Sequence, residues 1–196
     1  AKTAERLGVD AVIVVGNETG GHPGMSDVGT IVALPRVVDS VSIPVIAGGG
    51  FADGRGLVSA LAFGAEGILM ETRFMATTEA PIHDYVNRWL VEADETNTIV
   101  VQRNIGTPSR VALNEVSKEV DRLEKQGAAL EELLPFITGK RSSQVYVEGN
   151  IDGGIWSCGQ SVGLIKEVLT VKQLIEQIVQ EAKQALAFVQ KRIDHS

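Results

Sequence analysis

Three short apolar runs occur in the first part of the chain, and each is too brief to form a helix. They cover residues 9–15, 44–47 and 67–70. None alternates with polar residues, which is typical of strands buried on both faces of a parallel sheet. Residues 30–41 and 53–64 lie between these runs and carry apolar side chains at helical spacing. The pattern predicts strand, helix, strand, helix, strand with right-handed crossovers, which is an α/β architecture.

Residues at the expected element ends agree with this pattern. Asp53 is a suitable N-cap for the second crossover helix, and Gly64 suits a left-handed helix end. Thr77 or Thr78 is expected to begin the next helix, and Thr170 the last one.

The rest of the chain has mainly helical spacing. The whole chain is therefore expected to divide into residues 1–93, which contain the three strands, and a mainly helical appended region, residues 94–196. Helices are expected at residues 1–7, 77–93, 114–126, 130–137 and 170–192, a strand at 98–101, a loop at 102–110 and a polar connector at 139–143. Glycines are too dense in residues 145–165 for an ordinary helix.

Composition narrows the class of protein. The chain has 196 residues, and 44% hydrophobic content is enough for a substantial core. Its net charge of -7 is spread over mixed-sign helices, so the basic stripe of a nucleic-acid-binding protein is absent. No apolar run approaches the ~18 residues of a membrane span, and the first residues lack a signal-peptide pattern. The single cysteine, Cys158, excludes an internal disulfide and predicts a reducing compartment, the cytoplasm.

Glycines or polar residues follow each predicted strand directly. The first strand leads into a glycine-rich loop at residues 16–24, the second into Gly48, Gly49 and Gly50, and the third into Glu71 and Thr72. Ligands collect at the carboxyl edge of parallel strands, and glycine lets backbone amides approach a ligand closely. An isolated glycine cluster also forms plain tight turns, but two such turns one crossover apart indicate a phosphate cradle.

These residues resemble a known family. The run PVIAGGG-x-x-DG-x-G, the alanine-containing helix after it, and the segments GAEGILM and TRF resemble the nitronate monooxygenases, formerly 2-nitropropane dioxygenases. The resemblance implies an FMN-dependent (β/α)8 TIM barrel, closely related to the FMN-dependent enoyl-acyl carrier protein reductases. It implies a partial barrel here, about strands six to eight with their helices, plus a mainly helical C-terminal region. The first five βα units are then missing, because a barrel needs eight.

The resemblance also assigns the cofactor site. The glycine turns after barrel strands seven and eight hold the FMN phosphate in this family, and a GQSVGL segment borders its active site. The cofactor-binding residues expected from the motifs are Gly20, Gly21, Ala47, Gly48, Gly49, Gly50, Glu71, Thr72 and Gln160. Glu71 departs from the family pattern, which usually has glycine there, and a carboxylate beside a phosphate would repel it. Gln160 has a helix-capping or turn role as its alternative.

The segment GNETGGHPG looks like the family's glycine-glycine-histidine motif, which identifies His22 as the expected catalytic residue. In the family this histidine lies beside the flavin ring and interacts with the substrate. An imidazole with an unperturbed pKa near ~6.5 acts as a base or as a charged donor around neutral pH. Cys158 has no base near it in the sequence pattern, so a nucleophilic role is not expected. No residue is nominated as a metal ligand.

The function implied by the resemblance is FMN-dependent oxidation of alkyl nitronates or nitroalkanes by O2, which yields a carbonyl compound and nitrite. The alternative within the enzymes is an FMN-dependent enoyl-acyl carrier protein reductase using NAD(P)H. An alternative of another class is a non-catalytic, incomplete flavin-barrel fragment. Its exposed strand edge would then pair with another copy or with a complementary N-terminal barrel half. No nucleic acid and no membrane partner are expected.

Overall fold

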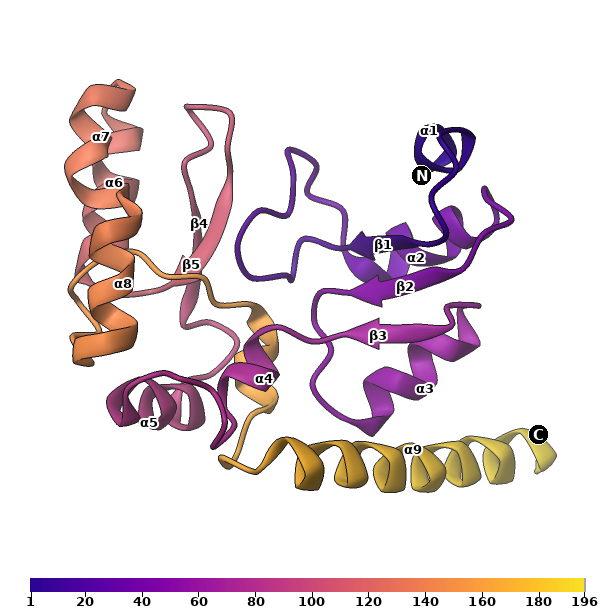
Figure 1. Cartoon of the computed structure of the whole chain (residues 1–196). Helices are drawn as coiled ribbons and strands as arrows, with labels where there is room; N and C mark the ends of the chain where they lie inside the picture. Colours follow the sequence, from indigo (N-terminus) through magenta and orange to yellow (C-terminus); the bar gives the residue numbers. More distant parts are fainter. Residues whose placement is uncertain (196) are drawn as a thin grey trace.

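The computed structural model describes residues 1–195, which form a parallel sheet flanked by helices and a second, largely helical region (Figure 1). The sheet contains β1 (Val12–Val15), β2 (Val45–Gly48) and β3 (Gly67–Leu69) in that order, all parallel. The register pairs Val15 with Gly48 and Gly48 with Leu69, so the three strands end at one edge. The α/β prediction is confirmed.

Helices α2 (Thr30–Val38) and α3 (Gly54–Ala62) connect these strands, as the apolar spacing predicted. The side chain of Asp53 accepts a hydrogen bond from the amide of Gly56, which confirms its N-cap role. Gly64 has a φ of 89°, the left-handed conformation expected where that helix ends. The core between helices and sheet is apolar and is formed by Leu34, Val45, Ala47, Ala60 and Ala65.

The prediction that the first strand is buried on both faces is wrong. Strand β1 pairs only with β2 within residues 1–195, and the side chain of Ile13 is 58% exposed. The other strand runs are half-buried or buried, as β2 shows with Val45 and Ala47 in the core. Three strands do not close a barrel within the described residues.

A β-hairpin begins the second region. Strand β4 (Thr98–Val101) was predicted, whereas β5 (Ser109–Ala112) includes two residues assigned to a loop. The two strands are antiparallel, with Val101 opposite Ser109. The loop prediction is wrong at Ser109 and Arg110 because long-range contacts pair this stretch with Gly21 and Ser157 on its other side.

Three helices follow the hairpin. Both α6 (Glu115–Lys125), capped by Asn114, and α7 (Leu130–Ile137) are as predicted. The predicted polar connector is wrong, since residues 139–143 begin helix α8 (Gly139–Glu148). Arg141 donates to the carbonyl oxygens of Pro135 and Gly153, and Ser142 donates to that of Ile155. These contacts with distant residues stabilise a helix that the polar composition did not indicate.

Helix α5 (Asp84–Glu92) begins later than the predicted start at Thr77 or Thr78. Thr77 instead forms a bridge with Leu169, and Pro81 disfavours helical geometry at the residue before it. The N-cap is His83, whose ring nitrogen Nδ1 accepts a hydrogen bond from the amide of Tyr85. The side chain of Tyr85 is 53% exposed, whereas Val86 and Leu90 are buried.

The chain ends in α9 (Val171–Asp194), a long helix that lies along α3 (Figure 1). Thr170 caps it, as predicted. The backbones approach closely at the crossing, because a Cβ placed on Gly54 would lie 2.2 Å from the amide nitrogen of Ala182. The remaining elements are short: α1 (Lys2–Arg6), α4 (Thr72–Met75) and the 3-10 helix η1 (Gln160–Leu164). Among the described residues, no helix has the length and apolar character needed to cross a bilayer.

Candidate active site

The predicted phosphate cradle lies where β2 and β3 end. Gly49 and Gly50 have φ values of 84° and 82°, in the left-handed region that favours glycine. Paired strands lie about 4.8 Å apart, and Gly48 pairs with Leu69, so the turn after β2 is next to the turn that contains Glu71. Within residues 1–195, the amide N–H groups of Gly49, Gly50 and Thr72 donate no hydrogen bond. These amides fit an anion that accepts several main-chain hydrogen bonds.

Two carboxylates lie beside this cradle, and the contacts of each are defined. Glu71 is exposed, and one of its carboxylate oxygens accepts a hydrogen bond from the Thr19 hydroxyl at 2.9 Å. The carboxylate of Glu18 accepts from the amide and the hydroxyl of Thr30, each at 3.0 Å, which caps α2. Both side chains therefore interact with donors from the protein, and the cradle amides remain available.

The glycine-rich loop after β1 and the GQSVGL segment meet at the same edge. The Gln160 amide donates to the carbonyl oxygen of Glu18 at 2.9 Å, and the Gly159 amide donates to the Thr72 hydroxyl at 2.9 Å. A Cβ on Gly20 would lie 2.8 Å from the nitrogen of Gly159, so only glycine allows this approach. Glu18, Gly50 and Gln160 line one cavity of about 320 Å³.

Ala47 is placed differently from the other predicted cofactor residues. It lies inside β2, and its side chain is completely buried in the core between sheet and helices. Gly48 ends that strand, and a Cβ there would lie 2.7 Å from Val15 Cγ1. Contact with a ligand at these two positions is therefore restricted to the backbone.

His22 lies apart from the cradle, at the mouth of a second cavity of about 280 Å³. Its ring nitrogen Nδ1 is 3.0 Å from the carbonyl oxygen of Pro108. A carbonyl oxygen can only accept, so Nδ1 carries the proton and Nε2 of the neutral ring has a free lone pair. Gly21 supports this position, because its amide and carbonyl both bond to the backbone of Arg110. This arrangement provides a proton acceptor on a loop held against β5.

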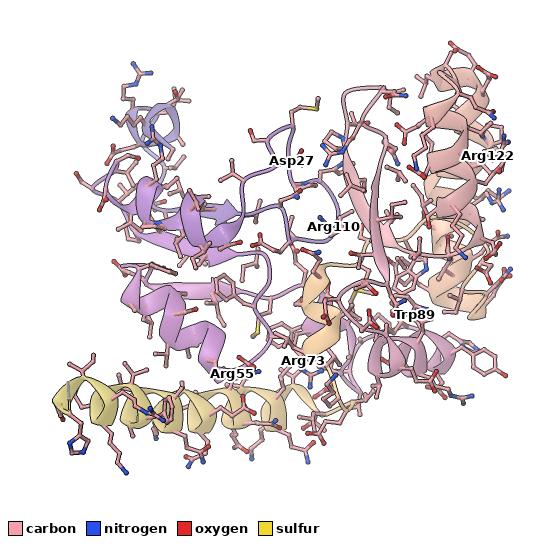
Figure 2. The ribbon with its side chains drawn as sticks, turned by 180° about the vertical axis from the view of Figure 1, so that it is seen from behind. Asp27, Arg55, Arg73, Trp89, Arg110 and Arg122 are labelled. Carbon is pink, nitrogen blue, oxygen red and sulfur yellow. The ribbon has the colours of Figure 1, made fainter. Side chains whose placement is uncertain are left out.

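Arg110 ties the histidine loop to the hairpin (Figure 2). Its Nε donates to the carbonyl oxygen of Asn17 at 2.8 Å, and its Nη1 donates to the hydroxyl of Thr98 at 3.0 Å. Burial lowers the pKa of this guanidinium, and the nearby charge of Glu18 opposes that shift. Arg103 and Asp27 form a more exposed ion pair at 2.6 Å between the same two segments. These arginines therefore position the loop.

Cys158 does not have the properties of a nucleophile. Its side chain is buried, and burial raises the pKa of its thiol to about 12. The thiol is therefore protonated at neutral pH, as the absence of a base in the sequence pattern indicated.

The cavity behind His22 contains residues that sequence reasoning missed. Gln102, Ser142, Tyr146 and Ser157 contribute polar groups to its wall. Ser142 and Tyr146 are four residues apart, which places them on one face of a helix. This four-residue spacing could have indicated that the two side chains face the same way. It has that meaning only if residues 139–148 are helical, and the sequence did not predict a helix there.

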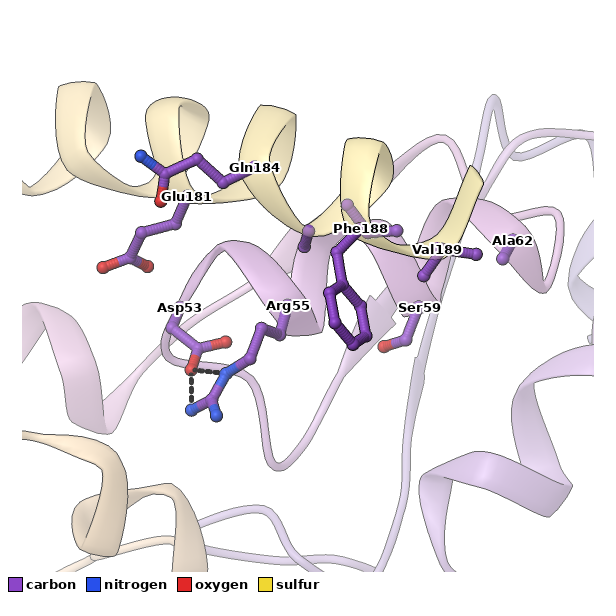
Figure 3. Close-up of a pocket in the computed structure, with 10 residues that line it drawn as sticks. Asp53, Arg55, Ser59, Ala62, Glu181, Gln184, Phe188 and Val189 are labelled. Atoms are coloured by element: carbon purple, nitrogen blue, oxygen red, sulfur yellow. Dashed lines mark hydrogen bonds and ion pairs between the residues drawn. The ribbon is translucent and has the colours of Figure 1, made fainter. Parts of the chain in front are cut away.

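A larger cavity of about 760 Å³ lies between α3 and α9 (Figure 3). Phe188 and Val189 contribute apolar surface, and Asp53 pairs with Arg55 at one end. None of the predicted site residues lines it.

Comparisons with known proteins agree with the motifs. The family described as nitronate monooxygenase matches residues 1–181. An octahydro-indene-carboxyl-CoA dehydrogenase from Rhodococcus jostii is 36% identical, over 93% of this chain and 61% of its own length. A probable nitronate monooxygenase from Bacillus subtilis is 31% identical, over 90% of this chain and 53% of its own.

Solved structures are similar over nearly the whole chain. FabK from Thermotoga maritima has a TM-score of 0.88 and 38% identity, over 97% of this chain and 60% of that one. A nitroalkane oxidase from Streptomyces ansochromogenes has a TM-score of 0.76 and 27% identity, over 96% of this chain and 56% of that one. The chain thus spans about three fifths of the length of these relatives. It belongs to the nitronate monooxygenase family, whose members are flavin-dependent oxidoreductases.

Proposed function

We propose that the chain contributes the phosphate-binding and proton-accepting part of an FMN-dependent enzyme that oxidises alkyl nitronates. In this proposal β1, β2 and β3 are strands six to eight of a (β/α)8 barrel, and residues 94–196 border its active site. The observation that carries the proposal is the pair of adjacent main-chain turns with unpaired amides at the ends of β2 and β3.

The chain's own residues have separate tasks. The amides of Gly49, Gly50 and Thr72 would hold the FMN phosphate by hydrogen bonds that need no cation. Gln160, which shares a cavity with Gly50, would donate to a polar atom of the cofactor. The bound flavin supplies the electron transfer.

His22 handles the proton. Because Nδ1 donates to Pro108, Nε2 is the atom that would accept the carbon-bound proton of a nitroalkane. Once protonated, the same nitrogen would donate to a nitronate oxygen and stabilise its negative charge. Residues of the hairpin and of α8 line one side of the cavity.

A second candidate is reduction or oxidation of an acyl thioester with a nicotinamide as the hydride source. The likeness to the CoA dehydrogenase and to FabK supports it, at 36% and 38% identity. The same cradle and histidine would serve either reaction, so these features do not choose between them.

The test begins with flavin absorbance of the purified chain, followed by anaerobic reduction with ethyl nitronate or NADH. Bleaching by nitronate alone supports the first proposal, and bleaching by NADH supports the second. A preparation that stays colourless when FMN is added supports the non-catalytic alternative.

The variant His22→Ala tests the proton-transfer role. It should retain FMN affinity, since His22 lies outside the cradle cavity, and slow reduction by a nitroalkane about 100-fold, the usual contribution of a general base. Reduction by the preformed nitronate should slow less. An unchanged rate with the nitroalkane would remove His22 from the mechanism.

A further inference from the structure

Arg110 contacts both ends of the short segment that precedes His22 (Figure 2). At the start of the segment, its Nε donates to the carbonyl oxygen of Asn17 at 2.8 Å. At the end, its main-chain amide donates to the carbonyl oxygen of Gly21 at 2.6 Å, and its own carbonyl oxygen accepts from the amide of Gly21 at 2.9 Å. One residue of β5 therefore holds the segment from Asn17 to Gly21 at two points.

The guanidinium of Arg110 is itself fixed on the hairpin. Its Nη1 donates to the hydroxyl of Thr98 in β4 at 3.0 Å, and its main chain lies opposite Val100 in the ladder. The side chain is buried. An arginine fork donates in fixed directions, so two acceptors on different segments set the position of one relative to the other.

The start of the segment depends on this guanidinium. The side-chain oxygen Oδ1 of Asn17 is buried and has no hydrogen-bond partner within residues 1–195. The amide of Asn17 donates to the carbonyl oxygen of Val28, which belongs to the same loop. Without Arg110 the carbonyl group of Asn17 would lose its donor, and an unpaired acceptor away from water is costly. The loop should then move until another donor reaches this oxygen.

The middle of the segment is attached elsewhere. The carboxylate of Glu18 caps α2, and the hydroxyl of Thr19 donates to Glu71. Both contacts lead to the first region and not to the hairpin. The carbonyl oxygen of Pro108, which accepts from the imidazole, lies two residues before Arg110. Arg110 therefore aligns the segment with the part of the chain that contains this acceptor.

The contact with Pro108 decides which ring nitrogen of His22 carries the proton. A carbonyl oxygen only accepts, so the 3.0 Å contact favours the tautomer with the proton on Nδ1. The side chain of His22 is exposed. A ring that moved away from Pro108 would bond to water through either nitrogen, and both tautomers would be populated. The free lone pair on Nε2 thus depends on the alignment of loop and hairpin.

We propose that Arg110 is a positioning residue that fixes the Nδ1–H tautomer of His22, and so directs Nε2 toward the substrate, by holding both ends of the segment from Asn17 to Gly21 against the hairpin. The consequence for proton transfer rests on the proposed function. The tautomer itself requires neither flavin nor substrate.

Long-range proton–nitrogen correlation spectra of the full chain, recorded without flavin, test this inference. Both tautomers exist only in the neutral ring, so the spectra are recorded at about pH 8.5, above the pKa of ~6.5 of an unperturbed imidazole. The chain has three histidines, and the spectrum of His22→Gln identifies the signals of His22 by their loss.

Arg110→Gln is the test variant, and Arg73→Gln is the matched control. The two arginines are equally buried, at 7% and 4% exposure, and Arg73 donates to the carbonyl oxygen of Ala76, outside the histidine loop. Thr98→Val is a second test variant, because it removes one anchor of the guanidinium and leaves Arg110 in place. Circular dichroism shows whether each variant is folded.

The unmodified chain and Arg73→Gln should both show His22 protonated on Nδ1. In Arg110→Gln the ratio of the Nδ1–H to the Nε2–H form should fall about three- to tenfold, the factor that the loss of one hydrogen bond produces. Thr98→Val should lower the ratio less, and it decides the test if Arg110→Gln does not fold. The inference is overturned by an unchanged ratio in the folded test variant, an equal fall in Arg73→Gln, or a dominant Nε2–H form in the unmodified chain.

The positioning role and the proposed oxidation fail differently. If Arg110→Gln changes the tautomer ratio but no nitronate or nitroalkane reduces the flavin of the unmodified chain, the proposed oxidation fails and the positioning role stands. If the unmodified chain is reduced while Arg110→Gln keeps the ratio of the unmodified chain, the positioning role fails alone.

Discussion

Gly49→Ala should destabilise the chain more than its backbone angle alone explains. Gly49 has a φ of 84°, where a residue with a Cβ costs about 1–2 kcal/mol. The added methyl group would also lie 3.0 Å from the nitrogen of Gly16 and 3.1 Å from the hydroxyl oxygen of Thr30. Contacts this short require a neighbour to move.

Neither neighbour can move freely. The Thr30 hydroxyl lies within hydrogen-bond distance of the carboxylate of Glu18 and the carbonyl oxygens of Gly48 and Gly49. Gly16 donates its amide hydrogen to the carbonyl oxygen of Gly48, which extends the pairing of β1 with β2. We therefore add an overpacking cost of about 1–3 kcal/mol. The free energy of unfolding should fall by about 2–5 kcal/mol in total.

Gly106→Ala is the control. Gly106 has a φ of 77°, and a Cβ there would meet nothing within 4 Å, so it reports the backbone cost alone. Urea unfolding followed by circular dichroism compares both variants with the unmodified chain. With an m-value of about 2 kcal/mol/M, Gly49→Ala should have a midpoint about 0.5–1.5 M below that of Gly106→Ala. Equal midpoints would show that the turn after β2 is not packed against Gly16 and Thr30.

Two further predictions concern a surface charge and a buried thiol. Glu71→Gly should tighten FMN binding by up to about fivefold, because it removes a carboxylate beside the cradle, and this gain in affinity should shrink in high salt. Flavin fluorescence titration at two ionic strengths measures the affinity. Weaker binding would mean that the contact of Glu71 with Thr19 is needed to position the loop. Cys158 should resist iodoacetamide at pH 8 in the folded chain and react in 8 M urea, because burial raises the pKa of its thiol to about 12. Mass spectrometry follows the alkylation, and equal rates in the two conditions would contradict the burial of this side chain.

The elements that sequence reasoning placed correctly have local signals. Asp53 and Thr170 accept hydrogen bonds from amides three residues ahead, and Gly64 has the positive φ that ends a helix. The glycine turn after β2 was predicted in the same way, and Gly49 and Gly50 have positive φ values that favour glycine. Its role in holding a phosphate stays a prediction. In such cases the residue and its partner lie within one turn of each other.

The elements that were missed depend on partners distant in sequence. Strand β5 is fixed by β4, by Gly21 and by Ser157, and α8 by contacts of its arginine and serine with residues 153–155. Tyr146 lies on α8, so its place in the cavity wall was missed for the same reason. Gln160 was nominated from its motif alone, and the structure places it in one cavity with Glu18 and Gly50, which come from loops more than a hundred residues earlier. Its contact with a cofactor stays a prediction.

The loop after β1 connects the two cavities, and its hydrogen bonds explain how one segment can serve both. At one end, Glu18 caps α2 and its carbonyl oxygen accepts from Gln160, which fixes the loop beside the cradle. At the other, Gly21 pairs with Arg110 and His22 bonds to Pro108, which fixes the loop beside the hairpin. A displacement of the hairpin would therefore move the imidazole relative to the cradle. The position of the imidazole thus depends on the second region through the contacts of Gly21 and His22 with Arg110 and Pro108.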